Sequence, residues 1–297
     1  MFLRAINHYN SIRGARGGIR DIGCVKKNKE RINMSIAVIT GASSGIGREF
    51  AFKLRDLAGV SEFWFIARSV ERMEKVRDEL GLPCKIISAD LATREGIEKY
   101  RTALEAEKPE ISYLVNAAGF GVFGSFDILS EDTVTDMIDV NIKATVLITH
   151  MSVPYMKRGG RIIELGSGSC FTPLPHFNIY SSSKVFVLHY TKSLNYELKP
   201  YGIRATCFCP GWVDTAFLPK SLDAPGAYVP KKMKPLLDVS KVVTGCVKAS
   251  MKGKAMYVTG LYTKFQHMLF KLVPDCILTK LWLGMLKKNE VKDSESK

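Results

Sequence analysis

The chain has 297 residues, of which 46% are hydrophobic and 24% charged, a composition typical of a globular protein. The net charge is +14, but the basic surplus comes without a nucleic-acid motif or interleaved aromatic residues, which argues against DNA or RNA binding. No apolar run approaches the roughly 18 residues of a membrane-spanning helix. Seven cysteines without C-x-x-C spacing argue against a disulfide framework or a metal site. We expect a cytoplasmic protein without a metal.

The first 33 residues differ from the rest of the chain. They carry eight Lys or Arg against Asp21 and Glu30, and they lack a secretory apolar core. Gly14, Gly17 and Gly18 interrupt any helix. We expect a basic, disordered segment over residues 1–33, or a start placed ahead of a working first residue at Met34. The Arg-rich, acid-poor composition leaves an organelle transit peptide as the alternative.

From Ser35 onward, apolar strands alternate with helices. The expected strands cover residues 36–40, 62–68, 84–90, 111–119, 160–168, 202–211 and 254–260. The expected helices cover residues 47–58, 69–80, 94–107, 130–150, 178–199 and 238–250. Continuous apolar strands separated by helices predict a parallel sheet that is covered on both faces. We therefore predict one doubly wound α/β domain over residues 34–260, followed by a helical extension over 261–297.

Three glycines, Gly41, Gly45 and Gly47, lie between the first strand and the first helix, in the stretch TGASSGIG (40–47). Glycine weakens helices and strands, so three within seven residues suggest that a ligand approaches the backbone closely. Backbone N–H groups at a helix N-terminus can hold a pyrophosphate. Ligands of doubly wound sheets bind at the carboxyl ends of the strands, where this turn lies. The turn therefore predicts a dinucleotide site.

This glycine turn and four later motifs resemble the short-chain dehydrogenase/reductase family. The later motifs are DL at Asp90–Leu91, NAAG at 116–119, YSSSK at 180–184 and PGWVDT at 210–215. The NAAG motif departs from the family's usual NNAG, because Ala117 replaces the second Asn. The resemblance covers residues 35–260 and implies a Rossmann-like domain that binds a nicotinamide cofactor and catalyses oxidoreduction at CH–OH or C=O groups.

The resemblance also implies which residues form the site. The expected catalytic residues are Asn141, Ser167, Tyr180 and Lys184. The expected cofactor-binding residues are Thr40, Gly41, Ser43, Ser44, Gly45, Ile46, Gly47, Arg68, Asp90, Leu91, Asn116, Gly119, Tyr180, Lys184, Pro210, Gly211, Val213 and Thr215.

Tyr180 and Lys184 are four residues apart on an expected helix and so share one face. A free tyrosine has a pKa of about 10 and needs a nearby positive charge to act near neutrality, which Lys184 can supply. By resemblance, Tyr180 exchanges the proton, Ser167 orients the substrate oxygen and Asn141 holds a water beside Lys184. The alternatives are a surface Tyr–Lys pair, Ser169 in place of Ser167, and Asn141 as a polar residue at a helix kink.

The choice of nicotinamide cofactor depends on the turn after the second strand, in the stretch FIARS. A cofactor without a 2′-phosphate usually meets an acid here, but no acid precedes Glu71. Arg68 is suited to grip a phosphate, and Ser43 and Ser44 could donate to it. We therefore expect NADP(H), used in the direction of carbonyl reduction. The alternative is an ordinary solvated arginine.

Two C-terminal segments bear on the substrate. Residues 215–237 are rich in proline, which predicts an irregular segment long enough to be a lid, with apolar side chains toward the ligand. Residues 261–288 predict a basic amphipathic pair of helices broken at Pro274. Such a pair could lie on a membrane surface or cover a lipid-like substrate. A packed cap or a dimer contact is the alternative.

These segments lead us to expect a hydrophobic ketone or alcohol as substrate, steroid-like or bile-acid-like, as in a hydroxysteroid dehydrogenase-like member of the family. A 3-oxoacyl-thioester reductase is the alternative within the enzymes. Outside them, the alternatives are a catalytically idle NADP-sensing protein and a peripheral membrane scaffold. The resemblance further implies a homodimer or homotetramer that packs through helices 130–150 and 178–199.

Overall fold

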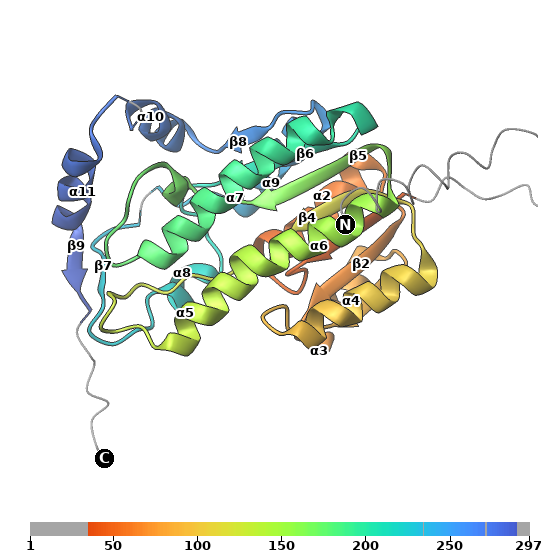
Figure 1. Cartoon of the computed structure of the whole chain (residues 1–297), viewed down its shortest axis with the longest axis horizontal. Coiled ribbons are helices and arrows are strands. Elements are labelled where there is room, and N and C mark those ends of the chain that lie inside the picture. Colours follow the sequence, from red (N-terminus) through yellow and green to blue (C-terminus); the bar gives the residue numbers. More distant parts are fainter. Residues whose placement is uncertain (1–34, 234, 271, 290–297) are drawn as a thin grey trace, which may run out of the picture.

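A parallel sheet of seven strands forms the centre of the molecule, for which the computed structural model describes residues 35–233, 235–270 and 272–289 (Figure 1). The strand order is β3-β2-β1-β4-β5-β6-β8. The bounds are β1 Ile36–Thr40, β2 Glu62–Ala67, β3 Cys84–Ser88, β4 Ile111–Asn116, β5 Met156–Leu165, β6 Arg204–Cys209 and β8 Met256–Val258. All seven predicted strands are confirmed. The expectation for residues 1–33 lies outside the described residues.

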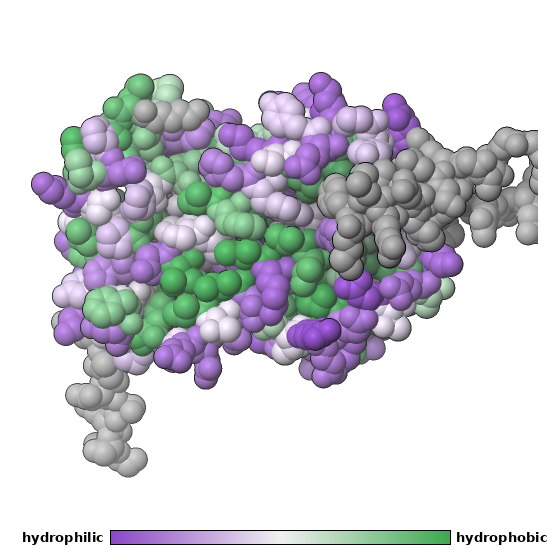
Figure 2. Space-filling model, in the orientation of Figure 1, coloured by the Kyte–Doolittle hydropathy of each residue, from purple (hydrophilic) through white to green (hydrophobic). Residues whose placement is uncertain are grey.

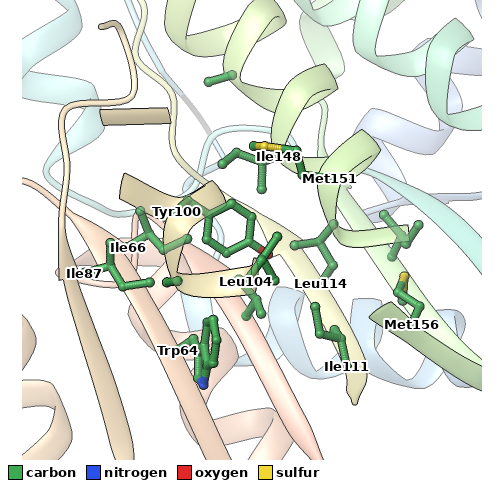
Figure 3. Packing of buried hydrophobic residues seen from close by; sticks show 14 of the residues in the cluster. Trp64, Ile66, Ile87, Tyr100, Leu104, Ile111, Leu114, Ile148, Met151 and Met156 are labelled. Carbon is green, nitrogen blue, oxygen red and sulfur yellow. The ribbon is translucent and has the colours of Figure 1, made fainter. Parts of the chain in front are cut away.

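Helices cover both faces of the sheet. One face carries α2 (Gly45–Ala58), α3 (Val70–Leu80) and α9 (Val239–Met251). The other carries α4 (Arg94–Glu107), α6 (Thr145–Ser152) and α7 (Asn178–Glu197). On the α4 and α6 side, Tyr100 and Ile148 pack against Trp64 and Leu114 of the strands (Figure 3). This two-sided burial explains the continuous apolar strands and confirms the doubly wound fold.

The helix predicted over residues 130–150 is interrupted. α5 (Glu131–Ile138) and α6 are joined by a π-helical turn, Asp139–Ala144, which contains Asn141. The Asn141 amide donates to the Phe120 carbonyl at 2.9 Å, and its Oδ1 accepts from the Phe120 N–H at 3.1 Å. This pair of bonds holds the wider turn against the loop that follows β4. The expected helix was therefore wrong in its continuity, and the expected kink at Asn141 is present.

The expectation that residues 215–237 lack regular structure was also wrong. The segment forms a short helix, α8 (Phe217–Ser221), and a short strand, β7 (Tyr228–Pro230). β7 pairs antiparallel with β9 (Leu286–Lys288) at the C-terminal end of the described chain, with Tyr228 opposite Lys288. The segment thus gains its order from a distant partner.

The expected helical extension is present as α10 (Leu261–Leu269) and α11 (Asp275–Gly284), separated near Pro274. In Figure 1 this extension hooks over the end of the molecule that lies far from α3 and α4. Trp282 of α11 and Leu286 of β9 join a separate apolar cluster with Phe123, Phe177 and Tyr180. Across the described parts of the chain, no helix combines the length and hydrophobicity needed to cross a bilayer.

Candidate active site

The glycine turn has a shape that only glycines permit. Gly41 and Gly45 have positive φ angles of 68° and 55°, a region that L side chains rarely adopt. A Cβ on Gly47 would lie 2.3 Å from the carbonyl oxygen of Gly41, so the turn closes on itself. A Cβ on Gly41 would lie 2.8 Å from the Ala118 nitrogen, which places the turn against the loop after β4.

The N-terminus of α2 is arranged to receive an anion. Ser69, Thr93 and Ser130 cap the N-termini of their own helices by accepting a backbone N–H. Ser44, at the start of α2, forms no such bond within the described structure, and the first turn contains no acid. The first N–H groups of a helix carry a partial positive charge and need an acceptor. The residues present therefore fit the diphosphate of a dinucleotide, with Ser43 half-buried and Ser44 exposed beside it.

Four further residues that are predicted to bind the cofactor lie at the same edge of the sheet as the glycine turn: Thr40, Gly45, Ile46 and Arg68. The Thr40 hydroxyl accepts from the Ala118 N–H at 3.1 Å, and a Cβ on Gly45 would lie 3.6 Å from Thr215. Ile46 is half-buried against the core. Arg68 stands exposed at the end of β2.

The DL motif lies after β3. Asp90 is exposed, and its carboxylate accepts from the Ala92 N–H at 3.0 Å. A Cβ on Gly96 would lie 1.9 Å from the Asp90 carbonyl oxygen, so the motif packs tightly on the start of α4. Leu91 is buried in the core. The exposed carboxylate is thus the part of this motif that remains accessible to a ligand.

The PGWVDT motif follows β6 and leads into α8. The Pro210 carbonyl accepts from the Gly168 N–H at 2.7 Å, and the Gly211 N–H donates to Thr259 at 3.1 Å. Val213 is buried and bridges to Leu237. The motif therefore holds the loop after β5 beside the loop after β6.

Tyr180 lies in an aromatic enclosure near the N-terminus of α7. Its ring packs against Phe177 at a centroid distance of 4.5 Å and against Phe217 at 5.5 Å. A Cβ on Gly121 would lie 2.5 Å from the Tyr180 ring, so glycine is needed there. Burial raises the pKa of the Tyr180 phenol. An isolated phenol in this enclosure is thus a weak acid that keeps its proton.

The Ser167 hydroxyl interacts with the Tyr180 phenol, which counteracts part of the rise in that pKa. Ser167 lies two residues after β5, and its oxygen also accepts from the Ser169 N–H at 3.1 Å. The Ser169 hydroxyl is buried and meets no hydrogen-bonding partner in the part of the chain that the structure describes. The geometry therefore favours Ser167 over Ser169 as the partner of the tyrosine.

Lys184 lies one helical turn beyond Tyr180, with its Nζ 5.5 Å from the Tyr180 ring centroid. The ammonium donates to the Leu165 carbonyl at 2.8 Å, and burial lowers the pKa of Lys184 to about 8. Gly119 leaves room beside it, because a Cβ there would lie 3.4 Å from Nζ and 2.8 Å from the Asn141 Oδ1. Asn141, Lys184 and Tyr180 thus meet at one place, as the resemblance implies. Their roles stay predictions.

Asn116 differs from the other predicted cofactor residues. Its side chain is buried beneath the site, where Nδ2 donates to Thr149 at 2.8 Å and to the Glu164 carboxylate at 3.2 Å. Thr149 also donates to Glu164 at 2.8 Å. Only the backbone of Asn116 could therefore face a cofactor.

Glu164 is the residue of this region that sequence analysis missed. It is completely buried near the carboxyl end of β5, and burial raises its pKa to about 7. Its Oε1 accepts from Thr149 and Asn116, while Oε2 finds no partner among the described residues. Glu164 is also close enough to Lys184 for the two charges to interact. A carboxyl group in this setting holds its proton at mildly acidic pH.

Glu164→Gln is expected to remove a pH-dependent loss of stability. A folded-state pKa of about 7, above the ordinary 4.5, means that the unfolded chain releases this proton first as pH rises. Stability therefore falls between pH 4.5 and 7 and stays low above it. Relative to the parent, the variant should gain roughly 3 kcal/mol of unfolding free energy across this interval. Urea unfolding at pH 5 and pH 8 measures the gain.

The matched control for this prediction is Glu105→Gln, which neutralises an exposed carboxylate on α4. It should follow the parent at both pH values. Equal pH dependence in Glu164→Gln and the parent would show that Glu164 is ionised at pH 5 in the folded protein.

Sequence analysis also predicted only part of the cap, by which we mean the apolar residues that cluster with Tyr180. Trp282 of α11 stacks on Phe123 at 6.4 Å and donates its indole N–H to the Pro175 carbonyl at 2.9 Å. Phe123 in turn stacks on Phe177 at 3.8 Å. The aromatic residues could have drawn attention in the sequence, but nothing local links Trp282 to Phe123. This arrangement places packed apolar side chains beside the Tyr180 ring.

The assembled site combines a glycine turn at a helix N-terminus, the buried Tyr180 phenol with the neighbouring Ser167, and the buried Lys184. Such a set can bind a dinucleotide and exchange a proton with a ligand oxygen. Among the residues that the structure describes, no group of His, Cys, Asp and Glu could hold a metal ion.

Comparison with known proteins agrees with this geometry. A family model described as short chain dehydrogenase matches residues 35–225. An uncharacterized oxidoreductase of Staphylococcus epidermidis is 32% identical over 187 residues, which are 62% of this chain and 80% of that protein.

Two further comparisons concern a human relative and a solved structure. The inactive hydroxysteroid dehydrogenase-like protein 1 of Homo sapiens is 35% identical over 191 residues, which are 61% of this chain and 56% of that protein. The solved structure of a short-chain dehydrogenase from Sphingobium yanoikuyae in complex with NADPH superposes with a TM-score of 0.68 and 22% identity. That superposition covers 89% of this chain and 98% of the other. It supports the fold.

Proposed function

Because this chain belongs to the short-chain dehydrogenase family, a family of oxidoreductases, we propose that it reduces the carbonyl group of a hydrophobic ketone with NADPH. The observation that carries this proposal is the meeting of Tyr180, Ser167 and Lys184 beneath an aromatic cap, at the edge of the sheet that holds the glycine turn. A nucleotide-sensing protein needs the turn but not this proton-handling set.

The proposed chemistry follows from the positions of the side chains. The nicotinamide, when bound, supplies the hydride. The Ser167 hydroxyl orients the substrate oxygen, and the Tyr180 phenol donates its proton to that oxygen. Lys184 supplies positive charge that stabilises the phenolate left behind. Asn141 stays bound to Phe120 and keeps the loop of Gly119 beside Lys184.

Arg68 supports the choice of NADPH. It is exposed at the end of β2, within the edge that carries the glycine turn, and its guanidinium can pair with a 2′-phosphate. A hydrogen bond to a charged group contributes about 1.5–3 kcal/mol. Arg68→Gln should therefore lower kcat/KM for NADPH by roughly 10- to 100-fold while leaving the value for NADH nearly unchanged. Initial rates with the two cofactors measure this change.

Arg72→Gln is the matched control for this test, because Arg72 is an exposed arginine in the first turn of α3, four residues after Arg68. It should leave the ratio of the two kcat/KM values near that of the parent. Equal loss with both cofactors in Arg68→Gln would argue against recognition of a 2′-phosphate by Arg68.

The cap supports a hydrophobic substrate. Apolar residues from four segments surround the tyrosine: Phe123, Leu174, Phe177, Phe217, Val229, Trp282 and Leu286. A planar or steroid-like ketone can bury its surface against aromatic rings of this kind. The names of the relatives fit both a steroid-like substrate and a 3-oxoacyl thioester, and the aromatic side chains of the cap support the steroid-like one.

The second candidate function is that of a protein that binds the nucleotide but catalyses no reaction. The human relative's name calls that protein inactive, and burial alone makes Tyr180 a weak acid. NADPH oxidation is the test, with keto-steroids, keto bile acids, a 3-oxoacyl thioester and aryl ketones as substrates. Turnover with a ketone supports the reductase. Tight NADPH binding without turnover on any of them supports the sensing protein.

We also propose self-association through α5, α6 and α7. Apolar side chains of Ile138, Val185 and Phe186 are exposed there, and Figure 2 shows an apolar band along these helices. Sedimentation of the intact chain, with Phe186→Ser as the variant, tests this contact.

A further inference from the structure

The outer side of α10 presents an apolar stripe to solvent. Leu261, Phe265 and Met268 follow each other at helical spacing and are 86%, 55% and 58% exposed, and Leu272, in the turn after the helix, is 78% exposed. The opposite side of the helix meets the body of the protein through the buried Thr263. Figure 2 shows apolar side chains gathered over this helix. α10 therefore has its hydrophobic side facing away from the core, which costs solubility and calls for a binding partner.

α11 repeats this arrangement. Leu278 and Trp282 are buried on its inner side, while Ile277, Leu281 and Met285 are spaced four apart on its outer side and are 48%, 62% and 48% exposed. The inner stripe explains why the helix packs on the cap. The outer stripe has no such role in the described structure, so the helix carries a second, exposed apolar stripe beside the buried one.

The charge around these stripes is strongly one-sided. Residues 261–289 contain five lysines and a single acid, Asp275. Lys264, Lys280, Lys287 and Lys288 are exposed. A second copy of the chain would bring the same lysines face to face, and like charges repel. An anionic lipid surface instead attracts each lysine and accepts the apolar stripes, so it matches both features.

We propose that the outer surface of α10 and α11, here called the outer stripe surface, docks on an anionic lipid bilayer. The apolar side chains enter the headgroup region, and the lysines contact the lipid phosphates. The inner side of α11 contributes Trp282 to the apolar cluster that contains Tyr180, so α11 would lie between that cluster and the bilayer. Docking of this kind needs no membrane-spanning helix and does not depend on the proposed reaction.

Sedimentation of the intact chain with vesicles tests this proposal. Vesicles of phosphatidylcholine alone are compared with vesicles of phosphatidylcholine and phosphatidylglycerol in equal parts. We expect at least about tenfold stronger binding to the phosphatidylglycerol vesicles, because each surface lysine contributes about 1 kcal/mol. Raising the salt concentration should weaken that binding. Equal binding to both vesicles, or none to either, would overturn the proposal.

Two variants distinguish binding through the outer stripe surface from nonspecific hydrophobic adsorption to the vesicles. The double variant Phe265→Ser with Leu281→Ser removes one exposed apolar residue from each helix and should lower vesicle binding about tenfold. The control is Phe126→Ser, which removes a 92% exposed phenylalanine from the loop between β4 and α5 and should bind as the parent does.

The same variants distinguish a second copy from a bilayer. If the double variant changes the sedimentation of the free protein from dimer to monomer and leaves vesicle binding unchanged, the outer stripe surface is a self-contact and the proposal is wrong. Circular dichroism of each variant shows that the fold is retained.

Discussion

Tyr180→Phe is expected to lower kcat for ketone reduction by roughly 10²- to 10⁴-fold, the usual contribution of a positioned proton donor. The phenylalanine keeps the packing on Phe177 and Phe217, because the ring is unchanged and only the hydroxyl is lost. NADPH affinity should therefore remain close to that of the parent. Steady-state rates and NADPH binding by fluorescence measure the two quantities separately.

The control for this variant is Tyr196→Phe, which removes a hydroxyl from an exposed position on the same helix. It should retain the rate of the parent. A Tyr180→Phe protein that reduces the ketone at the parental rate would exclude Tyr180 as the proton donor.

Gly47→Ala is expected to abolish cofactor binding at ordinary concentrations. The new Cβ would lie 2.3 Å from the Gly41 carbonyl oxygen, and backbone must move to relieve this contact. A displaced turn no longer aims the N–H groups of α2 at the phosphates. We expect NADPH affinity to fall by roughly 10²-fold and the unfolding free energy to fall by about 2 kcal/mol. Calorimetric titration and urea unfolding measure these changes.

Gly284→Ala provides the comparison, because a Cβ there meets no atom within 4 Å in the described structure and the backbone is not in the left-handed region. NADPH affinity should be unchanged in this variant. Parental affinity in Gly47→Ala would mean that the turn tolerates a side chain and that the phosphates bind elsewhere.

Most of the sheet could be predicted from the sequence because its signals are local. Runs such as residues 36–39 of β1 are apolar throughout, as is typical of strands buried on both faces. The pairing of β7 with β9 gave no such signal. Each strand has three residues, too few for a periodicity, and the partners come from distant parts of the chain. The π-helical turn also depends on a distant contact, between Asn141 and Phe120.

Part of the candidate site could likewise be predicted from local sequence patterns, and part of it depends on contacts between distant elements. The glycine turn and the Tyr180–Lys184 spacing are local patterns whose residues the structure brings together. Glu164 could not be recognised as part of the site, because its burial depends on Asn116 and Thr149 from two other elements. The contact between the cap and Tyr180 could not be recognised either, because α11 is brought to the tyrosine only by the tertiary fold.

Transfer of deuterium tests the central claim most directly. The intact chain is incubated with NADPH that carries deuterium at nicotinamide C4, on one face and then on the other, together with the best ketone of the panel. The account predicts an alcohol with one deuterium on the carbinol carbon from one of the two cofactors, and loss of this product in Tyr180→Phe. An alcohol without deuterium from either cofactor, or no alcohol at all, would contradict hydride transfer at this site.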